Sequence, residues 1–233
     1  MTLFCAVLPA SAQDSAKDVI IRLQTTYDET KDFSSLFTLE TFIKSVGAPS
    51  IVNGRVYFKK PGMMRWEYTD PIQDQIISDG ETLWYYIPKD KQVRIYKSSE
   101  AFEKDFFMGL LYGEGDLNKD FSATLQKLDD EKTKIYYLVD LTPKDERASI
   151  MKILMLVSKD NFLAQQINIY DRMGNITRIA FKDIVLNTGL KNSFFHFIVP
   201  SGVETVKVES EIAGPPETSV NVEIIEKDKE KNK

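Results

Sequence analysis

Hydrophobic and polar residues alternate along most of the chain, which is the pattern of β-strands that bury one face. The clearest case is the segment 54–71, GRVYFKKPGMMRWEYTDP. Mostly charged positions alternate there with five apolar ones, Val56, Phe58, Met64, Trp66 and Tyr68. The Pro61-Gly62 pair between them is a turn dipeptide. The segment therefore predicts two antiparallel strands that share one apolar face.

Similar runs predict further strands on both sides of this hairpin. Segment 33–45 places every second residue on one face, namely Phe33, Ser35, Phe37, Leu39, Thr41 and Ile43. Asp79-Gly80 is a hairpin signal between the runs 72–78 and 82–87. Alternation resumes at residue 121, and 191–206 is predicted to form a final irregular strand. The chain thus predicts a mainly β fold, an antiparallel meander of about 11 strands.

Two segments have helical spacing instead. In 15–28 the apolar residues form one stripe, at Ala16, Val19, Ile20, Leu23 and Tyr27. Ser15 is the expected N-cap, with Asp18 as its capping-box partner. Segment 98–117 has helical spacing at Phe102, Phe106, Phe107, Leu110 and Leu111, and it ends at glycines. Each helix needs an apolar surface, which the sheet can provide.

Residues 1–12 resemble part of a secretory signal peptide. The run MTLFCAVLPASAQ has no charged side chain, and Ala10-Ser11-Ala12 supplies an A-x-A cleavage site before Gln13. A buried N-terminal strand is the alternative. Cys5 lacks the small residues expected before a lipid-modified cysteine, so we expect a soluble exported protein whose mature chain has no cysteine.

Composition and candidate chemistry favour binding over catalysis. The formal charge is -5, and no basic block suggests nucleic acid as a partner. One histidine, His196, and one cysteine are too few for a zinc site, and His196 lies among aromatic residues where packing is its expected role. The acid pairs Asp116 with Asp120 and Asp129 with Asp130 lie in polar turns. We therefore expect no catalytic residue, no metal and no cofactor.

The apolar face of the meander has two possible roles. Two helices are few for a sheet of this size, so a curved sheet could enclose a hollow large enough for lipid. The aromatic residues could equally pack solidly against the helices. Periodicity does not distinguish a filled core from a cavity.

Several motifs, in order along the chain, resemble those of the LolA family of periplasmic lipoprotein carriers. GRVYFKKPGMMRWEYTDP and ISDGETLWYYIPKDKQV are similar to its K-R-P strand pair and its S-D-G-x-x-L-W-x-Y-x-P segment. FMGLLYGEGDLNKDF resembles the family's lid segment, and FFHFIVPSGVETV resembles its C-terminal motif. The resemblance covers 15–208. The matching positions of the first two motifs are Gly54, Lys59, Pro61, Trp66, Tyr68, Ser78, Asp79, Gly80, Leu83, Trp84, Tyr86 and Pro88.

The resemblance implies an unclosed antiparallel β-barrel capped by two or three α-helices, with an internal hydrophobic cavity. It implies a periplasmic carrier, not an enzyme, that takes acylated lipoproteins from an inner-membrane ABC transporter to the outer membrane, where an acceptor lipoprotein can receive them. We expect a monomer. A carrier of another lipid, or a lipid-sensing regulatory protein on the same fold, is the alternative.

The resemblance also implies roles for individual residues. Lipid-facing positions would be Phe37, Leu39, Val56, Phe58, Met64, Trp66, Tyr68 and Ile76, although ordinary core packing is the alternative for each. The underside of the lid would be Phe106, Phe107, Leu110 and Leu111. Lys60 stands where the family has an arginine that holds the lid shut, and lysine lacks the planar fork of that arginine. The carrier domain would span 13–208, followed by a C-terminal extension over 209–233.

Overall fold

The computed structural model describes residues 14–98, 116–145 and 148–208. The first six strands are β1 Asp32–Phe42, β2 Pro49–Lys59, β3 Met63–Asp70, β4 Gln75–Asp79, β5 Thr82–Ile87 and β6 Gln92–Lys97. The other six are β7 Phe121–Gln126, β8 Tyr136–Pro143, β9 Ile150–Ser158, β10 Ala164–Asp171, β11 Ile176–Leu186 and β12 Glu204–Lys207. The helices are α1 Ala16–Glu29, α4 Leu117–Asp120 and α5 Asp130–Ile135, with 3-10 turns η1 Pro88–Asp90 and η2 Asn192–Phe195.

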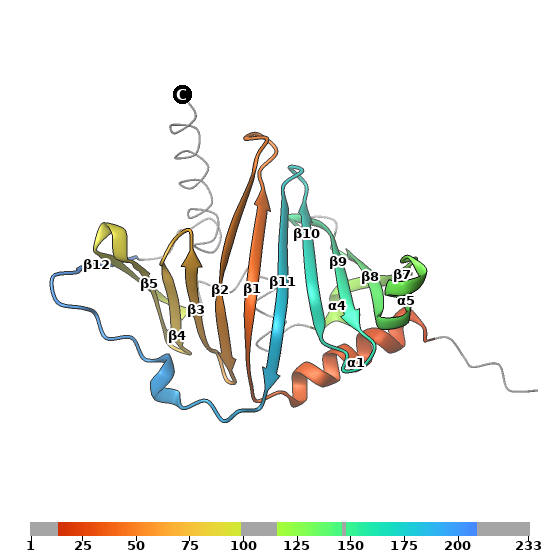
Figure 1. Cartoon of the computed structure of the whole chain (residues 1–233), viewed down its shortest axis with the longest axis horizontal. Coiled ribbons are helices and arrows are strands. Elements are labelled where there is room, and N and C mark those ends of the chain that lie inside the picture. Colours follow the sequence, from red (N-terminus) through yellow and green to blue (C-terminus); the bar gives the residue numbers. More distant parts are fainter. Residues whose placement is uncertain (1–13, 99–115, 146–147, 209–233) are drawn as a thin grey trace, which may run out of the picture.

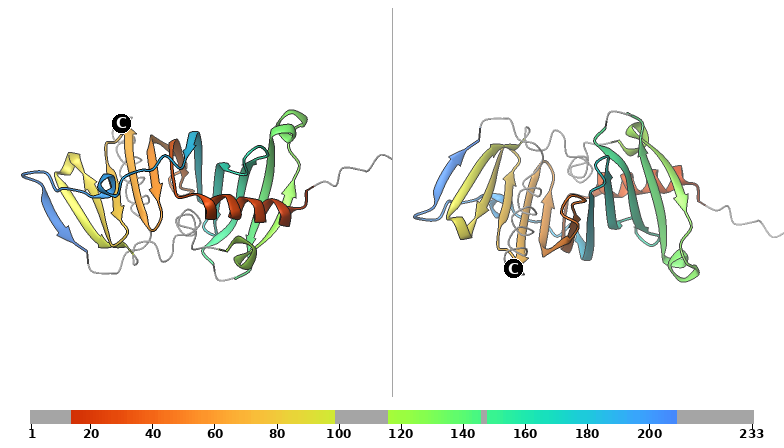
Figure 2. Two further views of the ribbon diagram at one scale, coloured as in Figure 1. Left: turned by 90° about the horizontal axis from the view of Figure 1, so that it is seen from below. Right: turned by 90° about the horizontal axis from the view of Figure 1, so that it is seen from above.

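All strands in the described part of the chain belong to one open sheet of 12 strands, in the order β12-β6-β5-β4-β3-β2-β1-β11-β10-β9-β8-β7 (Figure 1). Neighbouring strands are antiparallel except for β12, which pairs with β6 in parallel. The two ends of the sheet, β7 and β12, lie far apart in every view, so the barrel is unclosed (Figure 2). The predicted mainly β fold is therefore confirmed.

Helix α1 lies across the half of the sheet that contains β7 to β10, and we call the face it covers the inner face (Figure 2). Its predicted apolar stripe is buried there, through Val19, Ile20, Leu23 and Tyr27. Along β1, the predicted alternation is also confirmed, because Phe33, Ser35, Phe37, Leu39 and Thr41 are buried. Ile43 follows the end of the strand. The predicted second helix falls on residues 99–115, outside the described residues.

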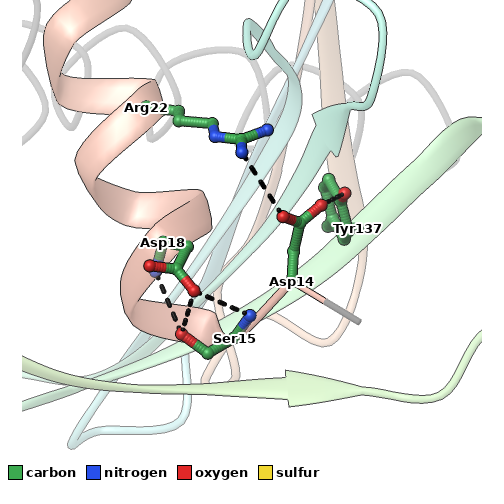
Figure 3. A network of polar contacts seen from close by, with 5 residues as sticks. All are labelled: Asp14, Ser15, Asp18, Arg22 and Tyr137. Carbon is green, nitrogen blue, oxygen red and sulfur yellow. Dashed lines mark hydrogen bonds and ion pairs between the residues drawn. The ribbon is translucent and has the colours of Figure 1, made fainter. Parts of the chain in front are cut away.

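The predicted capping box at the start of α1 is present (Figure 3). The Asp18 N–H donates to Ser15 Oγ at 3.2 Å, and the Ser15 N–H donates to Asp18 Oδ2 at 3.2 Å. Asp14, just before the cap, accepts a hydrogen bond from the Tyr137 hydroxyl and pairs with Arg22 at 3.6 Å. Burial and the Asp14 carboxylate raise the pKa of Tyr137 to about 12. These contacts join the start of α1 to β8.

The outer face of β4 to β6 is covered by the segment 187–203, which we call the C-terminal strap. The strap leaves β11, passes η2 against β3 and β4, and ends at β12 (Figure 1). Its apolar residues cover a second small core on the outer face, formed by Ile77, Trp84 and Val93. The prediction of a strand over 191–206 is wrong for most of that range, because only Glu204–Lys207 pairs with a neighbouring strand. The rest is held by side-chain contacts.

Candidate functional site

The inner face carries one continuous apolar surface across the sheet. All eight predicted lipid-facing residues lie on it, and each is at most 3% exposed. They are Phe37, Leu39, Val56, Phe58, Met64, Trp66, Tyr68 and Ile76. The structure therefore brings the predicted set together, on four neighbouring strands.

Strand register explains why these side chains meet. Val56 lies opposite Trp66, and Phe58 lies opposite Met64, so β2 and β3 present their apolar positions side by side. The Phe37 ring reaches across β2 to Trp66, with ring centroids 4.7 Å apart in an edge-to-face arrangement. Edge-to-face contacts are a preferred geometry of aromatic pairs. The centre of the inner face is thus an aromatic cluster.

Gly54 makes that cluster possible. It lies between Phe37 on β1 and Tyr68 on β3 in the strand register. A Cβ atom at this position would lie 2.2 Å from the Glu67 carbonyl oxygen and 2.7 Å from the Phe37 ring. Only a residue without a side chain lets the Phe37 ring cross β2 here. This gives a structural reason for the glycine that opens the GRVYF motif.

The same face extends further than the sequence predicted. Phe33, Leu83 and Tyr85 join the cluster from β1 and β5, and strands β8 to β11 continue it. The Tyr85 hydroxyl donates to the buried Asp74 carboxylate at 2.8 Å, which places one polar contact among these apolar side chains. Alternation in TLWYYI predicts the strand, but both of its faces are apolar, so the sequence does not say which residues face inward.

Lys60 lies at the other end of α1, beside its last carbonyls. Its ammonium group donates to the carbonyl oxygens of Tyr27 at 2.7 Å and Asp28 at 3.2 Å. The last turn of α1 contains no basic residue of its own, so Lys60 supplies the cation that favours a helix C-terminus. The predicted lid residues Phe106, Phe107, Leu110 and Leu111 lie outside the described residues. Lys60 thus holds the C-terminal end of α1. A role of Lys60 in closing a lid stays a prediction.

A shallow hollow of about 10 Å³, open to solvent and large enough for about one water molecule, lies beside this contact. It is lined by Tyr27, Thr30, Lys31, Asp32, Phe33, Phe58, Lys59 and Lys60. Phe33 and Phe58 stack at 5.0 Å and form its apolar part. Burial raises the pKa of Tyr27 to about 12. The hollow is a depression in the surface where the end of α1 meets β1 and β2.

Polar groups elsewhere have structural roles. Asp116 and Asp129 cap the short helices α4 and α5, so these acids lie at helix N-termini and not in plain turns. His196 is exposed and lies edge-to-face against Trp84 at 5.7 Å. Within the described ranges, no group of three or more His, Cys, Asp or Glu could hold a metal ion. Of the helices that the structure describes, none is both long and apolar enough to cross a bilayer.

The protein has an open sheet with one continuous apolar face and a helix docked on that face. It therefore belongs to the class of mainly β proteins with unclosed barrels. Residues 28–198 match the family model "Outer membrane lipoprotein carrier protein LolA", so the chain belongs to the LolA family.

Named relatives agree with this assignment, and a solved structure shares the fold. An outer-membrane lipoprotein carrier protein of Methylobacillus flagellatus is 30% identical over 66% of this chain and 72% of its own. That of Dechloromonas aromatica is 28% identical over 86% of this chain and 92% of its own. A conserved protein of Thermus thermophilus has the same fold, with a TM-score of 0.53 and 11% identity over 83% of this chain and 99% of its own.

Proposed function

We propose that this protein is a periplasmic carrier that binds the acyl chains of lipoproteins on its inner face. It would receive them from an inner-membrane ABC transporter and deliver them to the outer membrane, where an acceptor lipoprotein can take them over. The observation that carries the proposal is the continuous apolar inner face, in a member of a lipoprotein carrier family.

The physical requirement is a large apolar surface. Burial of one CH₂ group is worth about 0.8 kcal/mol, so a 16-carbon chain exposed to water costs roughly 13 kcal/mol. Only a surface that spans several strands can shield two or three such chains. The aromatic cluster around Phe37 and Trp66 and the flexible Met64 supply contacts that can adapt to chains of different shape. Acyl chains would replace contacts that now bury this face. Binding therefore requires α1, which covers part of the inner face, to move.

The two tryptophans provide a direct test. Trp66 lies on the inner face and Trp84 on the outer face. We expect a lipopeptide with brominated acyl chains to quench Trp66 by more than half in the Trp84→Phe variant. In the matched Trp66→Phe variant, the remaining Trp84 should be quenched little. Quenching of Trp84 alone, or of neither, would contradict binding on the inner face.

Native mass spectrometry of protein taken from the periplasm would identify the cargo. A co-purifying triacylated lipoprotein is the expected result. A lipid without polypeptide would favour a carrier of another lipid. A protein without cargo that also fails to take up a lipopeptide would favour the regulatory alternative.

We further propose that Lys60 helps to hold the inner face closed through α1. In Lys60→Leu, two carbonyls lose a charged donor, and such bonds are worth about 1.5–3 kcal/mol. Amide exchange at the C-terminal end of α1 should therefore become roughly ten times faster or more, and release of bound lipopeptide to acceptor vesicles should slow. Lys60→Arg is the control, because it keeps a cation. Normal exchange and release in Lys60→Leu would remove this role.

A further inference from the structure

Strand β7 forms one end of the open sheet. In the described part of the chain it pairs with β8 on one side and with no strand on the other. Figures 1 and 2 show it at the end of the sheet opposite β12. An unpaired edge presents main-chain donors and acceptors that can bind another extended chain.

The ladder with β8 shows which residues of β7 face outward. The Lys144 N–H donates to the Asp120 carbonyl, in register with the pairing of Phe121 with Pro143. In an antiparallel ladder, residues alternate between those bonded to the neighbour and those whose N–H and C=O point away. The groups of Ala123 and Leu125 therefore point away from β8. Among the described residues, neither has a hydrogen-bond partner on that side.

The β7 edge lacks the usual features that prevent pairing. Natural edge strands are protected by charge, proline, bulges or short length. From Phe121 to Gln126 the sequence FSATLQ has no charged residue and no proline, and its register is regular over six pairs. The opposite edge strand, β12, has four residues and carries Glu204 and Lys207 at its ends. The Phe121 N–H already donates to the Leu117 carbonyl, so among the described residues the part of the β7 edge available to an added strand is Ala123 to Leu125.

This edge also borders the inner face. The Phe121 side chain belongs to the inner apolar cluster, and Ala123 and Leu125 pack against it. The exposed side chains of Ser122, Thr124 and Gln126 alternate with them. The outward-pointing amides thus lie along the rim of the inner face, in the half that α1 covers. A polypeptide attached to those chains has to leave the inner face across a rim of this kind.

We propose that β7 binds the extended peptide that follows the acylated cysteine of the cargo, as an added strand. This inference rests on the proposed function. Main-chain hydrogen bonds recognise an extended chain without reading its side chains. Recognition of that kind would serve any acylated cargo, because every cargo has a peptide backbone whatever its sequence.

Two lipopeptides test the proposal. Both carry the same diacylated cysteine and the same uncharged six-residue peptide, but in one of them alternate amides are N-methylated, which removes the N–H groups of one edge. We expect the wild-type protein to bind the unmethylated form about ten times more tightly, because only that form can donate hydrogen bonds to the outward carbonyls of β7. Equal affinity would overturn the inference alone. Failure to bind either lipopeptide would overturn the proposed function and this inference with it.

A matched pair of variants assigns the preference to β7. Ala123→Pro removes an outward N–H without removing a ladder bond to β8, and Ala123→Val has a similar volume but keeps the N–H. We expect the tenfold preference to disappear in Ala123→Pro and to persist in Ala123→Val. An unchanged preference in Ala123→Pro would overturn the proposal. So would a wild-type dimer that Ala123→Pro converts to a monomer, since the edge would then bind a second copy.

Discussion

Gly54→Ala is expected to lower the free energy of unfolding by about 3 kcal/mol, and the melting temperature by roughly 6–12 °C. The new Cβ would lie 2.2 Å from the Glu67 carbonyl oxygen, which belongs to the neighbouring strand and cannot turn away. It would also lie 2.7 Å from the Phe37 ring. Strands β2 and β3 would have to separate, and the aromatic cluster with them. Urea unfolding followed by circular dichroism measures the change.

Gly47→Ala is the control for this variant. Gly47 has a φ of 76° with no neighbouring atom within 4 Å, so alanine there costs about 1 kcal/mol through backbone strain alone. Adding Phe37→Leu to Gly54→Ala should restore only part of the loss, because the carbonyl contact remains. A Gly54→Ala protein as stable as Gly47→Ala would show that the close approach of β2 and β3 is not maintained in solution.

Asp32→Ala is expected to release the start of the C-terminal strap and to cost about 3 kcal/mol or more. The buried Asp32 carboxylate accepts hydrogen bonds from the N–H of Thr188 at 2.8 Å, Gly189 at 3.0 Å and Leu190 at 3.3 Å. It also accepts one from the Thr188 hydroxyl at 3.0 Å. Removal of the carboxylate leaves all four donors without their acceptor.

Hydrogen exchange and fluorescence would follow this release. Amides at 188–190 should exchange at least tenfold faster, and Trp84 emission, isolated by Trp66→Phe, should shift to longer wavelength as the strap leaves the outer core. Asp183→Asn is the matched control. Asp183 is exposed and lies shortly before residue 187, where the strap begins, and its φ of 56° suits asparagine. Unchanged exchange at 188–190 in Asp32→Ala would show that other contacts hold the strap.

The sequence predicted those elements whose pattern is local. Alternation over 33–41 gave the buried face of β1, and Pro61-Gly62 and Asp79-Gly80 marked the turns where the chain reverses. Ser15 and Asp18 predicted the start of α1, because a capping box depends only on residues three apart. Seven of the eight inner-face positions follow the same two-residue period, and Ile76 was assigned with them through the resemblance to the LolA family.

Features that depend on distant segments could not be read in this way. In IQDQIIS and TLWYYI both faces are apolar, and the outer one is buried only because the strap covers Ile77 and Trp84. The role of Asp32 likewise depends on amides more than 150 residues later in the chain. The two faces of these strands therefore become distinguishable only when the path of residues 187–203 is known.

The parallel pairing of β12 with β6 also has a consequence for folding. Glu204 pairs beside Gln92, so this contact joins parts of the chain more than a hundred residues apart, and contacts of such separation form slowly. As the chain emerges from a ribosome or a translocon, the other eleven strands can assemble before β12 arrives. Until then the edge of β6 and the outer core around Trp84 are exposed to other chains. Docking of β12, the last strand that the structure describes, thus covers the edge of β6 beside the outer core, and a chaperone would protect this half of the sheet in the interval before it docks.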